Sequence, residues 1–425
     1  MIQAPQTVIP STLEITPVET RTLKNGLRLH TLQANEFEVV RLTLVFHAGP
    51  VTQQSPFVAG ATANLLAEGS DRLSGREIAE RLDFYGSYYE VNLDRDYVYI
   101  SFCSLRKYFH STLEMAEEIL LHPAFPEEEV ITYRTKRQQQ LAIERRKVDV
   151  TAREAFVESL FGAEHPYGVC YPESAYEGLS RQQLLDHYHC RYTAAHALAV
   201  CSGHIGDEER QGIEALCEKL PAGEAAPLHF PTPRSISQRY IERSEAVQSA
   251  IRIGRLLFPR RHPDFVGMQV VSTLLGGYFG ARLMHNLREE HGYTYGVMAT
   301  VVNFEREGYF AIATQVGSEV TEEALKEIFY EIERLRTEEV SEQELDLAKN
   351  ILTGEMMRIL DGPFGIADVA IENILSGEDH QAVNRTLQEI RQITPQRVRE
   401  LADRYLNPDD LSTIVVGKGL DWKQD

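Results

Sequence analysis

The stretch LLGGYFGARLMHNLREEHGYTYG, residues 274–296, says most about the fold of this chain. Paired glycines lead into an amphipathic segment that we expect to be helical and to end at Gly292. Glycine suits the position after a last helical turn because it adopts positive φ at little steric cost. The residues that follow, 294–302, alternate in the manner of a half-buried strand, so this stretch predicts a helix, a tight turn and a hairpin.

A weaker copy of the same pattern lies a little over 200 residues earlier, where LDFYGSY (82–88) places Gly86 in the position of Gly292. Each copy continues with a hairpin, a long helical pair, and a Ser- or Thr-capped helix that leads into a short apolar strand. The corresponding segments are 87–103 and 294–316, 113–141 and 325–356, and 179–205 and 393–419. So long a period indicates tandem domains. Gene duplication explains it economically, and chance similarity of two generic α+β patterns is the alternative.

The region between the copies contains prolines at 221, 227, 231 and 233, which predicts an extended linker over 221–235. We therefore predict an N-terminal domain at 1–220 and a C-terminal domain at 236–425. The predicted fold class is α+β, with two tandem homologous domains. Each would contain a mainly antiparallel sheet with helices packed on one face.

Composition excludes several classes of protein. The chain has 425 residues, with 43 Lys and Arg against 63 Asp and Glu, a formal net charge of −20. Such a chain repels phosphate backbones, so we expect no nucleic-acid partner, and no apolar run is long enough to predict a membrane span. The odd number of cysteines, five, without CxxC spacing favours a reducing compartment. Residues 1–17 do not look like a signal peptide, so we expect a cytoplasmic protein, or an extracytoplasmic one if a signal peptide has been removed.

The order of these elements resembles the pitrilysin/insulinase family of zinc metallopeptidases over nearly the whole chain. The similar stretches are LKNGLRLHTL (23–32), VVRLTLVFHAGP (39–50), AEGSDRLSG (67–75), AEHPYG (163–168) and, most specifically, residues 274–296. The resemblance implies a pitrilysin-like fold for both domains.

The zinc motif of that family is missing from the position where the resemblance places it. The motif is His-x-x-Glu-His, in which two His on one helical face bind zinc and the Glu acts as general base. Here the corresponding positions are Gly60, Ala63 and Asn64, and the third ligand, roughly 76 residues further on in the family, falls at Leu141. Gly, Ala and Leu offer no donor to zinc and Asn is a poor one. We therefore predict a degenerate zinc site, with no metal and no catalytic residue in this chain.

The second half keeps residues that the resemblance associates with the substrate. Arg288 and Tyr295 match a pair that reaches the peptide from the opposite half, and both could donate to the scissile carbonyl. In the structural alternative, Arg288 complements the dipole at a helix end and Tyr295 is a half-buried strand residue. Gly276, Gly277 and Gly280 either shape a helix terminus or line the substrate path.

Three further sets of residues have local explanations. Ser74 and Glu77 have the spacing of a capping box. His187 and Cys190 could share a helical face and bind a metal, although an incidental pair at a helix end explains them as well. His285 and His291 point about 120° apart on a helix, which disfavours a shared metal.

These observations predict a zinc-less subunit of a heterodimeric zinc metallopeptidase, inactive alone. A homologous partner subunit would carry the His-x-x-Glu-His motif and the zinc. This chain would contact unfolded peptide through Arg288 and Tyr295. The alternatives are a purely structural or peptide-binding module, an autonomous metalloenzyme that uses ligands such as His187 and Cys190, and a homodimer without zinc.

Overall fold

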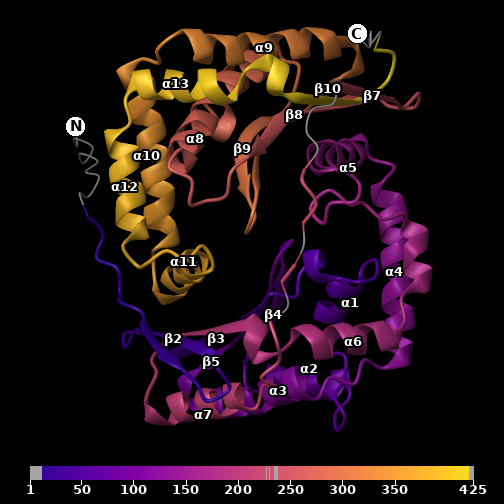
Figure 1. The fold of residues 1–425 in the computed structure, drawn as a ribbon, viewed down its shortest axis with the longest axis vertical. Coiled ribbons are helices and arrows are strands. Elements are labelled where there is room, and N and C mark those ends of the chain that lie inside the picture. Colours follow the sequence, from indigo (N-terminus) through magenta and orange to yellow (C-terminus); the bar gives the residue numbers. More distant parts are fainter. Residues whose placement is uncertain (1–11, 226, 229, 234–237, 421–425) are drawn as a thin grey trace.

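The computed structural model of this chain describes residues 12–225, 227–228, 230–233 and 238–420. Two β-sheets lie toward opposite ends of the long axis of the molecule, and helices connect them along both sides (Figure 1). Part of the predicted linker, residues 226, 229, 234 and 235, lies outside the described residues. Residues 1–11, most of the segment that we expect not to be a signal peptide, also lie outside the described residues.

The two sheets share one topology apart from the extra edge strand β1 of the first. The first has the strand order β1-β2-β6-β3-β5-β4 and the second the order β7-β11-β8-β10-β9. Strand β2 pairs with β6, and β7 with β11, in parallel, whereas all other pairs are antiparallel. The strands are β1 (Glu19–Thr22), β2 (Arg28–Gln33), β3 (Val39–Phe46), β4 (Tyr88–Leu93), β5 (Val98–Leu105), β6 (Ala197–Gly203), β7 (Gln238–Glu242), β8 (Gln248–Leu257), β9 (Val297–Asn303), β10 (Gly308–Gly317) and β11 (Ser412–Gly417). The predicted fold class, α+β with two homologous, mainly antiparallel units, is confirmed.

The helices fall into two corresponding sets. The first set is α1 (Val58–Leu65), α2 (Gly75–Phe84), α3 (Phe109–Leu121), α4 (Glu127–Glu144), α5 (Val148–Phe161), α6 (Arg181–Arg191) and α7 (Asp207–Glu218). The second is α8 (Phe265–Ser272), α9 (Thr321–Thr337), α10 (Glu342–Ile359), α11 (Pro363–Leu375), α12 (Ala382–Gln392) and α13 (Pro395–Tyr405). Two π-helical segments, Thr273–Gly277 and Met284–Glu290, follow α8.

Local sequence signals account for several element boundaries. The Ser74 side chain accepts a hydrogen bond from the Glu77 amide while the Glu77 carboxylate accepts one from the Ser74 amide, so the predicted capping box is confirmed. Gly86 and Gly292 have φ of 60° and 67°, as predicted for glycines that end corresponding helices. Both predicted hairpins also form, one from β4 and β5 and the other from β9 and β10.

The central strands β6 and β11 are buried on both faces. In β6, Ala199 and Cys201 belong to the main core of the first half, whereas Leu198 and Val200 face a separate cluster on the other side. Successive strand residues point to opposite faces, so a strand that is apolar throughout must be covered twice. The expectation of helices on one face only is therefore wrong.

The second covering helix comes from the other half of the chain. Helix α5 packs on the second sheet, where Phe156 joins a cluster with Ile414 and Val416 of β11. Helix α11 packs on the first sheet, where Ile371 joins Leu198 of β6. This reciprocal exchange fixes the two halves relative to one another. None of the helices among the described residues is both long and apolar enough to cross a membrane.

Candidate functional site

Three of the four positions predicted to form a degenerate zinc site come together in the fold. Gly60, Ala63 and Asn64 lie on α1 and Leu141 on α4, and Gly60, Asn64 and Leu141 line one cavity of about 360 Å³, which we call the Asn64 cavity. Ala63 is fully buried in the core of the first half and does not line it.

There is room for a side chain beside Gly60, but the groups around these positions are poor zinc ligands. A Cβ atom on Gly60 would lie 3.9 Å from Leu93 Cδ1 and 4.0 Å from the Tyr133 hydroxyl. The Asn64 side-chain amide donates to the Gly60 carbonyl at 2.7 Å, so it is already engaged. Burial raises the pKa of Tyr133 to about 12, so its phenol is neutral at ordinary pH. These residues do not fit a zinc ion.

A second cavity, of about 630 Å³, lies in the second half and is called the Tyr295 cavity. Gly276, Gly277, Phe279, Tyr295 and Met298 are among the residues that line it. The Tyr295 side chain is 90% exposed, and Phe279 and Met298 are 61% and 54% exposed. Large apolar side chains that face open space mark a surface suited to binding.

Arg288 lies next to this cavity without lining it. Its guanidinium carbon sits 4.5 Å above the ring centre of Phe279, in the geometry of a cation–π contact. Arg288 is half-buried in the last turn of the π-helical segment, as predicted. Tyr295, however, precedes β9 by two residues, so its placement on the strand is wrong.

The three glycines differ in their surroundings. Gly276 is buried, and a Cβ atom there would come within 2.7 Å of the Ala299 backbone nitrogen, so close packing against β9 requires glycine. Gly277 is exposed and lines the Tyr295 cavity. Gly280 is exposed too, but it is not among the lining residues.

The His and Cys side chains singled out in the sequence have separate surroundings. The His187 ring is buried and its Nε2 lies 3.1 Å from the Ala48 carbonyl oxygen, whereas Cys190 is exposed on the same helix. His285 Nδ1 lies 3.0 Å from a Glu289 carboxylate oxygen. His291 lies 3.9 Å from Glu327 instead, so the structure does not bring the two His together.

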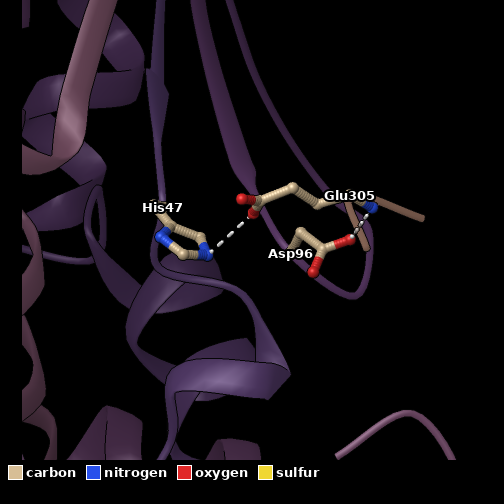
Figure 2. A group of neighbouring side chains, drawn as sticks. All are labelled: His47, Asp96 and Glu305. Atoms are coloured by element: carbon tan, nitrogen blue, oxygen red, sulfur yellow. Dashed lines mark hydrogen bonds and ion pairs between the residues drawn. The ribbon is translucent and has the colours of Figure 1, made fainter. Parts of the chain in front are cut away.

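A cluster that the sequence did not predict joins the two halves. His47 follows β3, Asp96 lies in the turn between β4 and β5, and Glu305 lies in the equivalent turn between β9 and β10 (Figure 2). His47 Nε2 lies 3.3 Å from Glu305 Oε2, and the Glu305 amide donates to Asp96 Oδ2 at 3.0 Å. The Tyr167 hydroxyl donates to the other Asp96 oxygen at 2.7 Å.

The ligand atoms of these three residues lie within 4.8 Å of one another, as in a metal site. Both Asp96 oxygens nevertheless accept hydrogen bonds from the protein, so no ion is needed to satisfy this buried carboxyl. Burial raises the pKa of Asp96 to about 6, and burial lowers the pKa of His47 although Glu305 opposes this. We interpret the cluster as the contact between two equivalent turns. Aligning the repeats could have paired these turns, but nothing local predicts that they touch.

Comparisons with known proteins agree with this architecture. Residues 178–352 match the family model described as the peptidase M16 inactive domain. A protein of Bacillus subtilis named "uncharacterized zinc protease YmxG" is 21% identical over 365 residues, which is 84% of this chain and 87% of that protein.

Solved structures show the same fold. A peptidase M16 inactive domain from Pseudomonas fluorescens superposes with a TM-score of 0.87 at 23% identity, covering 96% of this chain and all of that one. A protease from Helicobacter pylori superposes with a TM-score of 0.84 at 16% identity, covering 95% of this chain and all of that one. The family model and these folds confirm the resemblance that the sequence motifs indicate.

Proposed function

We propose that this chain, which resembles the pitrilysin-like family of M16 peptidases, is a zinc-less subunit that binds unfolded peptide for a zinc-bearing homologous partner. The partner would supply the metal, the activated water and the general base. On this proposal the isolated chain has no peptidase activity of its own.

The observation that carries the proposal is the contrast between the predicted sites. The Asn64 cavity has no metal-ligating side chain at Gly60 or Leu141, whereas Tyr295 projects, 90% exposed, at a cavity that no part of the described chain fills. A protein that had lost both catalysis and peptide binding would have no need to keep a phenol and aromatic surface in the open.

The chemistry of Arg288 and Tyr295 suits a peptide carbonyl. A phenol hydroxyl and a guanidinium both donate hydrogen bonds, and such donors stabilise negative charge that develops on a carbonyl oxygen. Arg288 is held over the Phe279 ring, so its guanidinium is positioned before a peptide arrives.

The edge of the second sheet offers a place for an extended peptide. Strand β9 is the last strand of that sheet, and Val297 and Met298 at its start line the Tyr295 cavity. An unpaired strand edge can hydrogen-bond the backbone of an added chain whatever its sequence. Peptide that pairs with β9 would pass beside Tyr295.

The test is proteolysis of an unstructured peptide by this chain, by a homologue that bears His-x-x-Glu-His, and by their mixture. We expect activity only in the mixture. The double variant Arg288→Ala/Tyr295→Phe should lower that activity by about 100-fold or more, because each lost donor to a developing oxyanion typically costs that much.

A matched control comes from α9, where Arg334 stacks over the exposed Tyr330 ring. The variant Arg334→Lys/Tyr330→Phe removes a guanidinium and a phenol hydroxyl away from both cavities, keeps a cation beside the buried Glu331, and should leave activity unchanged. Gel filtration should show that every variant still assembles with the partner. Full activity of the Arg288→Ala/Tyr295→Phe mixture would rule out the proposed roles.

One observation favours a second candidate, a structural or peptide-binding module without catalysis. The Arg288 guanidinium already has a partner in the Phe279 ring, so its position does not by itself require a substrate. Peptide binding with no proteolysis in any mixture would favour this candidate, and a homodimer would be one form of it.

A further inference from the structure

Positive charge gathers at the Asn64 cavity although the chain as a whole is strongly acidic. Four arginines line the cavity, and Glu154 is the one carboxylate among its lining residues. Arg145 holds Glu154 through both carboxylate oxygens, at 3.0 Å and 3.1 Å, and also contacts Glu173 at 3.0 Å. Arg145 is thus paired with both of these carboxylates, so neither is free to neutralise the other three arginines of the cavity.

Those three, Arg95, Arg137 and Arg153, have no carboxylate partner among the residues that the structure describes. Arg137 donates to the neutral side chain of Gln140 at 2.9 Å. The guanidiniums of Arg95 and Arg153 make no ion pair or side-chain hydrogen bond within that part of the chain. A guanidinium offers five donors, so both retain their full capacity for an anion.

Both free guanidiniums act on the same phenol. Burial raises the pKa of Tyr309, and the positive charges of Arg95 and Arg153 oppose that rise. Tyr309 also lines the Asn64 cavity. Arg153 lies on α5 and Arg95 in the β4–β5 turn, and both side chains line this one cavity.

Another cavity, of about 880 Å³, provides a contrast. It too is lined by arginines, but each has a partner from the chain itself. Arg41 contacts Asp368 and Arg385 contacts Asp379. The Asn64 cavity thus differs from this cavity in having two arginines, Arg95 and Arg153, without a partner among the described residues.

Helix α5 connects the Asn64 cavity with the Tyr295 cavity. Asp149, in its first turn, lines the Tyr295 cavity, and Arg153 lines the Asn64 cavity. Residues four apart lie on one helical face, about 6 Å apart along the axis. A few residues of extended peptide would therefore reach from one cavity to the other.

From this arrangement we infer that the Asn64 cavity, where zinc cannot be held, binds a carboxylate of the peptide through Arg95 and Arg153. The inference rests on the proposed peptide-binding function and names the chemical class of peptide, one with an acidic side chain or a free C-terminus close to the segment beside Tyr295. Guanidiniums bind carboxylates with paired, charge-assisted hydrogen bonds.

The test measures binding of labelled unstructured peptides to this chain alone by fluorescence anisotropy. One peptide carries Glu at internal positions and its twin carries Gln, and each is made with a free and with an amidated C-terminus. We expect Arg95→Gln/Arg153→Gln to weaken binding of the acidic peptides about tenfold or more, because the loss of a charged hydrogen bond typically costs at least that factor. Binding of the Gln peptide with an amidated end should change less than twofold. The Glu peptide with an amidated end and the Gln peptide with a free end show whether the bound carboxylate is a side chain or the C-terminus.

The double variant Arg28→Gln/Arg146→Gln is the control, since it removes the same charge at exposed arginines outside the cavity. It should leave all affinities unchanged. Equal weakening of acidic and neutral peptides, an equal effect of the control, no effect of Arg95→Gln/Arg153→Gln, or no binding of acidic peptide would each overturn the inference. The proposed function is judged separately by proteolysis in the mixture with the zinc-bearing homologue, so either can fail alone.

Discussion

The Asn64 cavity is lined mainly by the first half of a repeated fold and the Tyr295 cavity mainly by the second. The two cavities differ in how their residues are packed and exposed. In the first, Ala63 is part of the core, and Gly60 and Leu141 line an open cavity without offering a metal ligand. In the second, Tyr295 remains almost fully exposed. A core position such as Ala63 cannot take a polar zinc ligand without loss of packing, whereas an open aromatic surface costs the fold little to keep. The comparison separates α1, which contributes Ala63 to the core, from an aromatic surface that is open to solvent.

The largest expected effect tests whether α1 is part of the core of the first half. Ala63→Glu places a carboxylate where the described structure offers no space or partner for it, so it should lower the free energy of unfolding by about 3 kcal/mol or more at pH 7. Asn64→Glu, at the next and exposed position, is the control and should cost under about 1 kcal/mol. Urea unfolding of both variants measures the difference. Similar costs for the two would contradict the assignment of α1 to the core.

The next effect concerns the contact that fixes the two halves. Asp96 is 3% exposed, and burial raises its pKa to about 6 from 3.8. The native state therefore keeps a proton that the unfolded chain releases, and the stability this gives is lost as the pH rises through about 6. Relative to Asp96→Asn, the wild type should lose about 2 kcal/mol between pH 4 and pH 6.

Denaturant unfolding of both proteins across that pH range measures the loss. Other titrating groups, His47 included, are common to the two proteins and largely cancel in the difference. A pH-independent difference would show that the Asp96 carboxyl is not held protonated at the junction.

The smallest effect sharpens the description of the Tyr295 cavity itself. Gly276→Ala would bring Cβ within 2.7 Å of the Ala299 backbone nitrogen and should cost about 1–3 kcal/mol. Gly277→Ala meets only the Thr273 side chain, at 3.2 Å, and should cost under about 1 kcal/mol. Thermal unfolding distinguishes the two. If Gly277→Ala proves the costlier, then Gly277, and not Gly276, is the glycine that packing requires.

Sequence by itself determined the repeated order of elements, the caps and the absence of zinc ligands. These rest on local information: a Ser74–Glu77 box, a glycine with positive φ at 86 and 292, and residue types at 60, 63 and 141 that have no donor. Local spacing fixes which side chains share a helical or strand face, and the chemistry of a missing donor does not depend on the fold.

Only the tertiary structure decided which surfaces meet. The exchange of α5 and α11 between the sheets, the contact of Asp96 with Glu305, and the gathering of unpaired arginines at the Asn64 cavity join residues far apart in the chain. An apolar strand such as β6 shows that it needs cover on both faces, but its sequence does not say which helix provides it. Packing of apolar surface is not directional, so the partner is chosen by the path of the whole chain.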